Sequence, residues 1–209
     1  MRSRHQRSGR GRTIRILLAA SAISTSVVAA EYHVDTEAAR EVRFVSDAPI
    51  ESFNGVTERI DGYAVIPTEH LADGSDFDES RFYFEVDLGS IDTGIGLRNR
   101  HMRENYLHTE DFPYAMYAGA IDSVRAITDS TFLVYTSGDL TIHGVTQSHA
   151  TADTVTVREN GYHVVSHFPV ALPDHNIEIP KLMFLKINEV VELHLSFNLK
   201  RVDSSTEGE

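Results

Sequence analysis

The sequence predicts an all-β protein whose antiparallel strands close into a tall barrel. Three observations predict this class: several segments alternate apolar and polar residues, turn-forming residues separate those segments, and some of the segments are long. Residues 131–142 would extend roughly 40 Å at about 3.3 Å per residue, which favours a closed barrel over a compact sandwich. The 209 residues suffice for one domain with a hydrophobic core.

The clearest strands are four segments in which apolar residues recur at every second position, so that one face of each strand points toward a core. Asn160 and Gly161 stand between two strand-like segments, and this pair is a strong hairpin signal. The four apolar faces are Phe82, Phe84, Val86 and Leu88; Phe132, Val134, Leu140 and Ile142; Tyr162, Val164, Phe168 and Val170; and Val191, Leu193, Leu195, Phe197 and Leu199. Weaker strand candidates are residues 32–35, 42–46, 56–66, 115–124 and 150–158.

One helix is expected between residues 97 and 107, where the alternation stops. Asp92 or Thr93 would cap its N-terminus, and Gly94 would allow a positive φ in the turn before it. The Asp-Phe-Pro sequence at residues 111–113 would end the helical segment.

The first 30 residues have the features of a secretory signal peptide: a basic stretch up to Arg15, a short apolar segment, and small residues at Val28 and Ala30. We expect cleavage after Ala30, a barrel domain over residues 31–202, a polar tail over 203–209, and a periplasmic or secreted protein. An uncleaved anchor and a basic tail are the alternatives. No later segment is apolar enough to span a bilayer as a helix, so stable membrane insertion is not expected.

Composition excludes several classes of function. Because residues 1–30 carry six arginines and no acid, the rest of the chain has a net charge of −18, against −12 for the whole chain. Phosphate backbones repel such a charge, so nucleic acid is not an expected partner. The absence of Cys excludes disulfides and thiolate chemistry. The Gly-x-Ser-x-Gly, Walker and dinucleotide motifs are also absent, so we predict a protein that is not an enzyme and needs no cofactor.

Two ordered motifs resemble the signatures of the YceI-like family. Residues 87–94 have the sequence DLGSIDTG, followed by LRNRHM at 97–102 and FP at 112–113. Residues 138–146, GDLTIHGVT, are similar to the family's Gly-x-Leu-Thr-Ile-x-Gly-Val-Thr. The resemblance covers roughly residues 31–201. It implies a lipocalin-like, eight-stranded antiparallel β-barrel, often periplasmic, that binds amphiphilic lipids including polyisoprenoids in its lumen.

The sequence departs from the family pattern at three places. Phe44 is not followed by the Phe-x-Val-x-His pattern, the helix has Arg-Asn-Arg-His where many members have Arg-Asp-x-His, and residues 179–184 resemble a subgroup less tied to isoprenoids. The fold is therefore carried over more firmly than the identity of the lipid.

The inward faces of the strands supply the candidate lipid-binding residues, because a hydrocarbon chain needs a dry and apolar site. These are Phe82, Phe84, Val86, Phe132, Val134, Leu140, Ile142, Leu193, Leu195 and Phe197. The same side chains could instead fill the barrel against one another. If the helix caps one barrel end, Arg98, Arg100, His101 and Met102 lie at the mouth, where the basic groups would either meet a lipid headgroup or pair with acids such as Asp87 or Asp92.

Histidines invite a metal hypothesis, but no ligand spacing of a known type appears, so no metal is predicted. His101 and His108 would share a helix face, and His163 and His167 a strand face.

We predict a periplasmic carrier or scavenger that binds a long apolar lipid, a polyisoprenoid or a fatty-acyl amphiphile, in the barrel lumen. The alternative is a structural or stress-related interaction module with a filled barrel. A lipid-modifying enzyme built on His101 and Asp92 is less favoured. An exposed edge strand would allow a homodimer.

Overall fold

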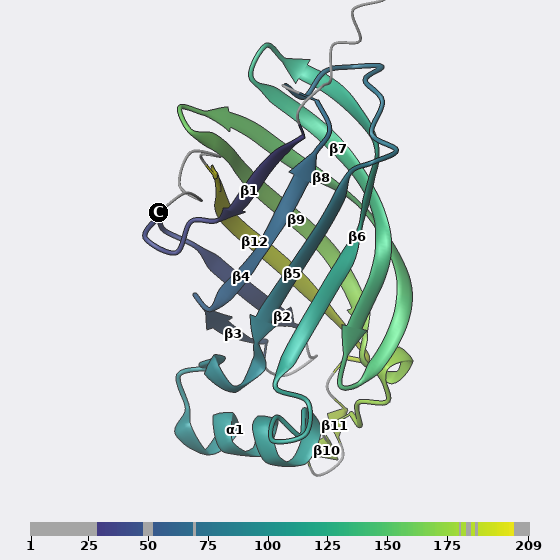
Figure 1. Cartoon of the computed structure of the whole chain (residues 1–209). Coiled ribbons are helices and arrows are strands. Elements are labelled where there is room, and N and C mark those ends of the chain that lie inside the picture. Colours follow the sequence, from purple (N-terminus) through teal and green to yellow (C-terminus); the bar gives the residue numbers. More distant parts are fainter. Residues whose placement is uncertain are drawn as a thin grey trace, which may run out of the picture.

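The structure is a computed structural model that describes residues 29–47, 52–68, 70–179, 181–182, 185–186 and 188–202 (Figure 1). The strands are β1 (Ala30–Val34), β2 (Glu41–Ser46), β3 (Phe53–Thr57), β4 (Ile60–Ile66), β5 (Arg81–Asp87), β6 (Tyr114–Thr128), β7 (Thr131–Ile142), β8 (Val145–Arg158), β9 (Gly161–Ala171), β10 (Lys181–Leu182), β11 (Leu185–Lys186) and β12 (Val190–Arg201). The helical elements are η1 (Leu88–Ser90), α1 (Gly96–His101), the π-helical turn η2 (Met102–Tyr106) and η3 (Leu172–His175). The signal peptide and polar tail predicted from the sequence lie almost wholly outside these residues.

The predicted eight-stranded antiparallel barrel is confirmed. Its strands follow the order β1-β4-β5-β6-β7-β8-β9-β12, and β1 pairs again with β12 to close the cylinder. β12 contacts β1 near Leu199 and contacts β2 from Glu192 to Ser196, so β1 and β2 lie one after the other along the same neighbour. β3 pairs with β2 and widens the wall at that end.

The weaker strand candidates all lie in strands, with one correction. The segment 56–66 was expected to be continuous, but it divides into β3 and β4 at residues 58–59. The Thr57 side-chain oxygen accepts a hydrogen bond from the Arg59 N–H, and this local contact replaces strand pairing there. The hairpin signal at Asn160 and Gly161 is confirmed, since β8 ends at Arg158 and β9 begins at Gly161.

The two ends of the barrel are covered differently (Figure 1). The loop between β4 and β5 places Leu71 and Phe77 in the hydrophobic core at one end, with exposed fractions of 5% and 4%. α1 and η2 lie at the opposite end, where Tyr106 and Leu107 pack against a second apolar cluster. The barrel therefore has an end plugged by a loop and an end covered by the predicted helix.

A pair of glycines allows β6 and β7 to approach each other closely. Gly119 and Gly138 are opposite one another in the register. A Cβ atom on Gly138 would lie 2.1 Å from the Ala118 carbonyl oxygen, and one on Gly119 would lie 2.1 Å from the Ser137 carbonyl oxygen. Because both obstacles are backbone atoms, the strands would have to separate to admit a side chain.

We predict that Gly138→Ala lowers the free energy of unfolding by about 1–3 kcal/mol, because the added methyl group overpacks a rigid backbone. Gly96→Ala is the matched control, since a Cβ there meets no atom within 4 Å. It should raise the free energy of unfolding by about 0.4–1 kcal/mol through the unfolded state. Urea unfolding followed by circular dichroism measures both, and equal effects at the two sites would contradict the close approach.

Candidate functional site

The barrel encloses a cavity of about 710 Å³. Its described lining comes from the inward faces of the strands, with further residues from η1, the helix and the segment around η3. Most of these residues are apolar. The volume lies within the range of roughly 300–1,000 Å³ that is usual for small-molecule sites.

Nine of the ten side chains proposed from the sequence as lumen residues line this cavity: Phe82, Phe84, Val86, Val134, Leu140, Ile142, Leu193, Leu195 and Phe197. Phe132 does not. It lies at the start of β7 and is buried in the core near the plugged end, with an exposed fraction of 7%. Alternation correctly predicts that Phe132 points inward. It gives no information on the position along the barrel axis, so it cannot distinguish a residue that lines the cavity from one that packs at the plugged end. Contact of the other nine with a lipid stays a prediction.

Sequence reasoning missed several lining residues. Phe44 and Phe53, from β2 and β3, meet edge to face with their ring centroids 5.7 Å apart. Met116 and Tyr117 also line the cavity. The signal at β6 was weak because its apolar residues fall on both faces of the strand. In β2, Val42 and Phe44 are apolar residues two positions apart, but the strand is too short for this alternation to give a strong signal.

The helix is attached to the preceding turn by side chains of its first turn, and the predicted capping by Asp92 or Thr93 is wrong. The N-cap residue is Ile95, which makes no side-chain cap. Asn99 instead reaches back: its Oδ1 accepts from the Thr93 N–H at 2.8 Å and hydroxyl at 2.6 Å, and its Nδ2 donates to Asp92 at 2.7 Å. The positive φ predicted at Gly94 is confirmed at 76°.

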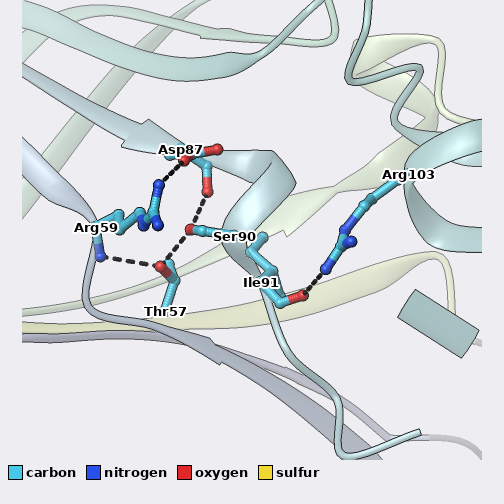
Figure 2. Close-up of polar contacts among 6 residues, drawn as sticks. All are labelled: Thr57, Arg59, Asp87, Ser90, Ile91 and Arg103. Atoms are coloured by element: carbon cyan, nitrogen blue, oxygen red, sulfur yellow. Dashed lines mark hydrogen bonds and ion pairs between the residues drawn. The ribbon is translucent and has the colours of Figure 1, made fainter. Parts of the chain in front are cut away.

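A second set of polar contacts fixes the segment between β5 and the helix (Figure 2). The Ser90 hydroxyl donates to the Asp87 carbonyl at 2.6 Å and hydrogen bonds the Thr57 hydroxyl at 2.5 Å. Arg59 forms an ion pair with the Asp87 carboxylate at 3.2 Å. These contacts attach the segment between β3 and β4 to η1 and to the end of β5, and so stabilise the barrel wall beside the helix.

Three of the four residues predicted for the barrel mouth line the cavity: Arg98, His101 and Met102. Arg100 is exposed and is absent from the described lining. The Arg98 guanidinium donates to the Thr93 hydroxyl and carbonyl at 3.0 Å each and lies 4.7 Å from the centre of the Phe53 ring. Arg98 is thus oriented at the helix end of the cavity, and its contact with a lipid headgroup stays a prediction.

Polar side chains also face the cavity, and the sequence analysis did not identify them. Tyr117, Thr136, Thr151, Asp153 and Ser166 come from the four consecutive strands β6 to β9. The Thr151 hydroxyl donates to Asp153 at 3.3 Å, and the Tyr117 and Thr136 hydroxyls are 3.2 Å apart. Burial raises the pKa of Asp153, against the opposing effect of hydrogen bonds from Ser166 and Thr151. The sequence analysis identified inward positions by their apolar side chains, so it could not identify polar side chains that point inward.

The histidines form pairs other than those considered from the sequence. His108 hydrogen bonds His143 at 2.8 Å, and His163 bonds the Asn198 side chain at 3.1 Å. His167 lies 3.1 Å from Glu192. In the described part of the chain, no group of three or more His, Asp or Glu side chains is arranged to hold a metal ion.

Among the described residues, no helix is both long enough and apolar enough to cross a membrane.

A closed antiparallel barrel around an apolar cavity defines a protein of the lipocalin-like class. Within that class, the chain belongs to the YceI-like family: the model of the YceI-like domain matches residues 32–199. The resemblance in the two sequence motifs is thereby confirmed. No curated protein matches the chain.

Two solved structures share the fold. A polyisoprenoid binding domain from Saccharophagus degradans, implicated in plant cell wall breakdown, aligns with a TM-score of 0.64 at 19% identity, covering 84% of this chain and 100% of that domain. Burkholderia cenocepacia BcnA aligns with a TM-score of 0.60 at 16% identity, covering 81% of this chain and 99% of that one. At these identities the likeness establishes the fold alone.

We predict that Asp153→Asn stabilises the protein at neutral pH. The folded-state pKa of Asp153 is raised above the ordinary 3.8, so the unfolded chain loses its proton first and wild-type stability falls as pH rises from 3.8 through the folded-state pKa. The advantage of Asn should therefore be largest at neutral pH and shrink at acid pH. Urea unfolding across this pH range measures it. Asp139→Asn, which removes an exposed acid on β7, is the control.

Proposed function

We propose that this protein binds a long apolar lipid, a polyisoprenoid or a fatty-acyl amphiphile, inside the barrel, and acts as a periplasmic carrier or scavenger. The observation that carries the proposal is the apolar cavity of about 710 Å³ within the closed barrel. A hydrocarbon chain offers no hydrogen bonds, so it gains affinity from burial alone, about 0.8 kcal/mol for each methylene group removed from water.

The relatives support the same chemical class. The Saccharophagus degradans domain is a polyisoprenoid binding domain, and its fold covers 84% of this chain. Family membership over residues 32–199 points the same way. The carrier role in the periplasm rests on the signal peptide predicted from residues 1–30.

The other two functions fit the geometry less well. A filled barrel would leave no room for the cavity that the inward side chains line. A lipid-modifying enzyme was expected to use His101 and Asp92, but the Asp92 carboxylate accepts hydrogen bonds from Asn99 and from the Gly94 N–H. We therefore favour binding without catalysis.

Blocking the lumen should weaken lipid binding. Val164 lines the cavity, whereas its neighbour Val165 points outward with an exposed fraction of 42%. We predict that Val164→Trp weakens binding of a polyprenol at least about tenfold, or about 1.4 kcal/mol. Val165→Trp adds the same bulk outside and should bind as the wild type does. Native mass spectrometry of each variant with added polyprenol tests this, and equal binding by both variants would place the ligand elsewhere.

Secretion is tested separately. Expression of the full chain in a Gram-negative host should yield, in the periplasmic extract, a protein whose mass corresponds to a chain starting at Glu31, beside the first residue of β1. A chain of full mass retained in the cytoplasm would refute the periplasmic assignment and leave lipid binding to be judged by the lumen variants.

A further inference from the structure

Five of the polar side chains that line the cavity come from neighbouring strands, β6 to β9, and we term them the lumen polar stripe: Tyr117, Thr136, Thr151, Asp153 and Ser166. Thr136 on β7 is directly opposite Thr151 on β8, and Asp153 follows two residues later on the same face. Asp153, Thr136 and Ser166 are buried, with exposed fractions of 9%, 7% and 7%. Their polar atoms are therefore screened from bulk water and face the cavity.

Asp153 lies at the deep end of the stripe. β8 begins at Val145, directly after the turn that contains His143, and the His143 side chain hydrogen bonds His108 just beyond the helical segment. Asp153 is eight residues further along β8, or roughly 26 Å at about 3.3 Å per residue. A ligand that reaches the stripe must extend far past the helix.

Two hydroxyl groups of the described residues, those of Ser166 and Thr151, donate to the Asp153 carboxyl group. An ionised carboxylate offers about four acceptor sites, so acceptor capacity remains toward the cavity. A pure hydrocarbon chain packed against Asp153 would keep a buried polar group from water and give nothing in return, which is unfavourable.

The charges of the lining oppose an anionic group at this depth. Of the described residues that line the cavity, the basic ones are Arg98 and His101, and both are on α1. A phosphate or carboxylate beside Asp153 would meet a like charge without a nearby cation. A hydroxyl or an amino group can instead donate to the carboxylate.

From these observations we infer that the lumen selects an amphiphile whose inner end carries a hydrogen-bond donor, a hydroxyl or an amine, which Asp153 accepts. This inference rests on the proposed lipid binding and specifies the chemistry of the ligand. Its hydrocarbon chain then runs along the apolar lining toward the helix end.

The experiment compares four ligands built on an unbranched chain of sixteen carbons, which in palmitate includes the carboxylate carbon: hexadecanol, hexadecylamine, hexadecyl methyl ether and palmitate. Affinities are measured by native mass spectrometry or calorimetry at neutral pH. The alcohol and the amine should bind at least about tenfold more tightly than the ether, equivalent to about 1.4 kcal/mol. Palmitate should gain nothing over the ether.

The variants assign the preference to Asp153. Asp153→Leu should bind the alcohol, the amine and the ether with equal affinity. Asp153→Asn, which is closer in shape and keeps an acceptor oxygen, should lose most of the preference for the amine, because a charged acceptor bonds more strongly than a neutral one. Asp139→Asn removes an exposed acid from the neighbouring strand and should retain the wild-type preference. Circular dichroism verifies that each variant is folded.

The outcomes separate this inference from the proposed function. Equal wild-type affinity for all four ligands would overturn the donor preference and leave lipid binding intact. Preferential binding of palmitate that is lost in Arg98→Ala would overturn it as well, by assigning the headgroup to the helix end. Failure to bind any of the four would overturn both.

Discussion

Closure of the sheet by β1 and β12 is the constraint on which the interior of this protein depends. Once β12 pairs with β9 on one side and with β1 and β2 on the other, the inner face of each strand has no route to solvent through an open sheet edge. Because side chains alternate between the two faces of a strand, every second side chain of each strand then points into the same enclosed interior.

That volume is not filled. Aromatic pairs such as Phe84 with Phe197, at 5.2 Å between ring centroids, pack against the hydrophobic core that includes Leu71 and Phe77, yet a cavity persists beside them. The lumen polar stripe crosses this apolar space, while Arg98 is held at the other end by Thr93 and Phe53. The interior thus has a gradient of chemistry along its axis, from hydroxyl and carboxyl groups at depth to a cation beside the helix.

Much of this could be predicted from the sequence, because alternation is a local signal. The faces of β5, β7, β9 and β12 follow directly from it, and the loss of alternation at residues 97–107 indicates the helix. The resemblance to the YceI-like family implies the number of strands. Other features could not be predicted, for two different reasons. The position of Phe132 along the barrel axis depends on which segments lie beside it, so it is a non-local property. The division of residues 56–66 and the contact of Asn99 with Thr93 are local, but they depend on how single side chains are oriented, which alternation does not specify. Asp153 escaped notice because an acid among alternating residues normally indicates the solvent face.

The loop that plugs one end of the barrel with Leu71 and Phe77 limits how a ligand could enter and leave the cavity. A flexible chain that enters beside the helix must advance one end first, and an eight-stranded barrel is too narrow for it to turn over once inside. The end that enters first is then the last to leave. If the proposed lipid enters this way, its orientation is set on entry, and the same end of the lipid always leaves the barrel first.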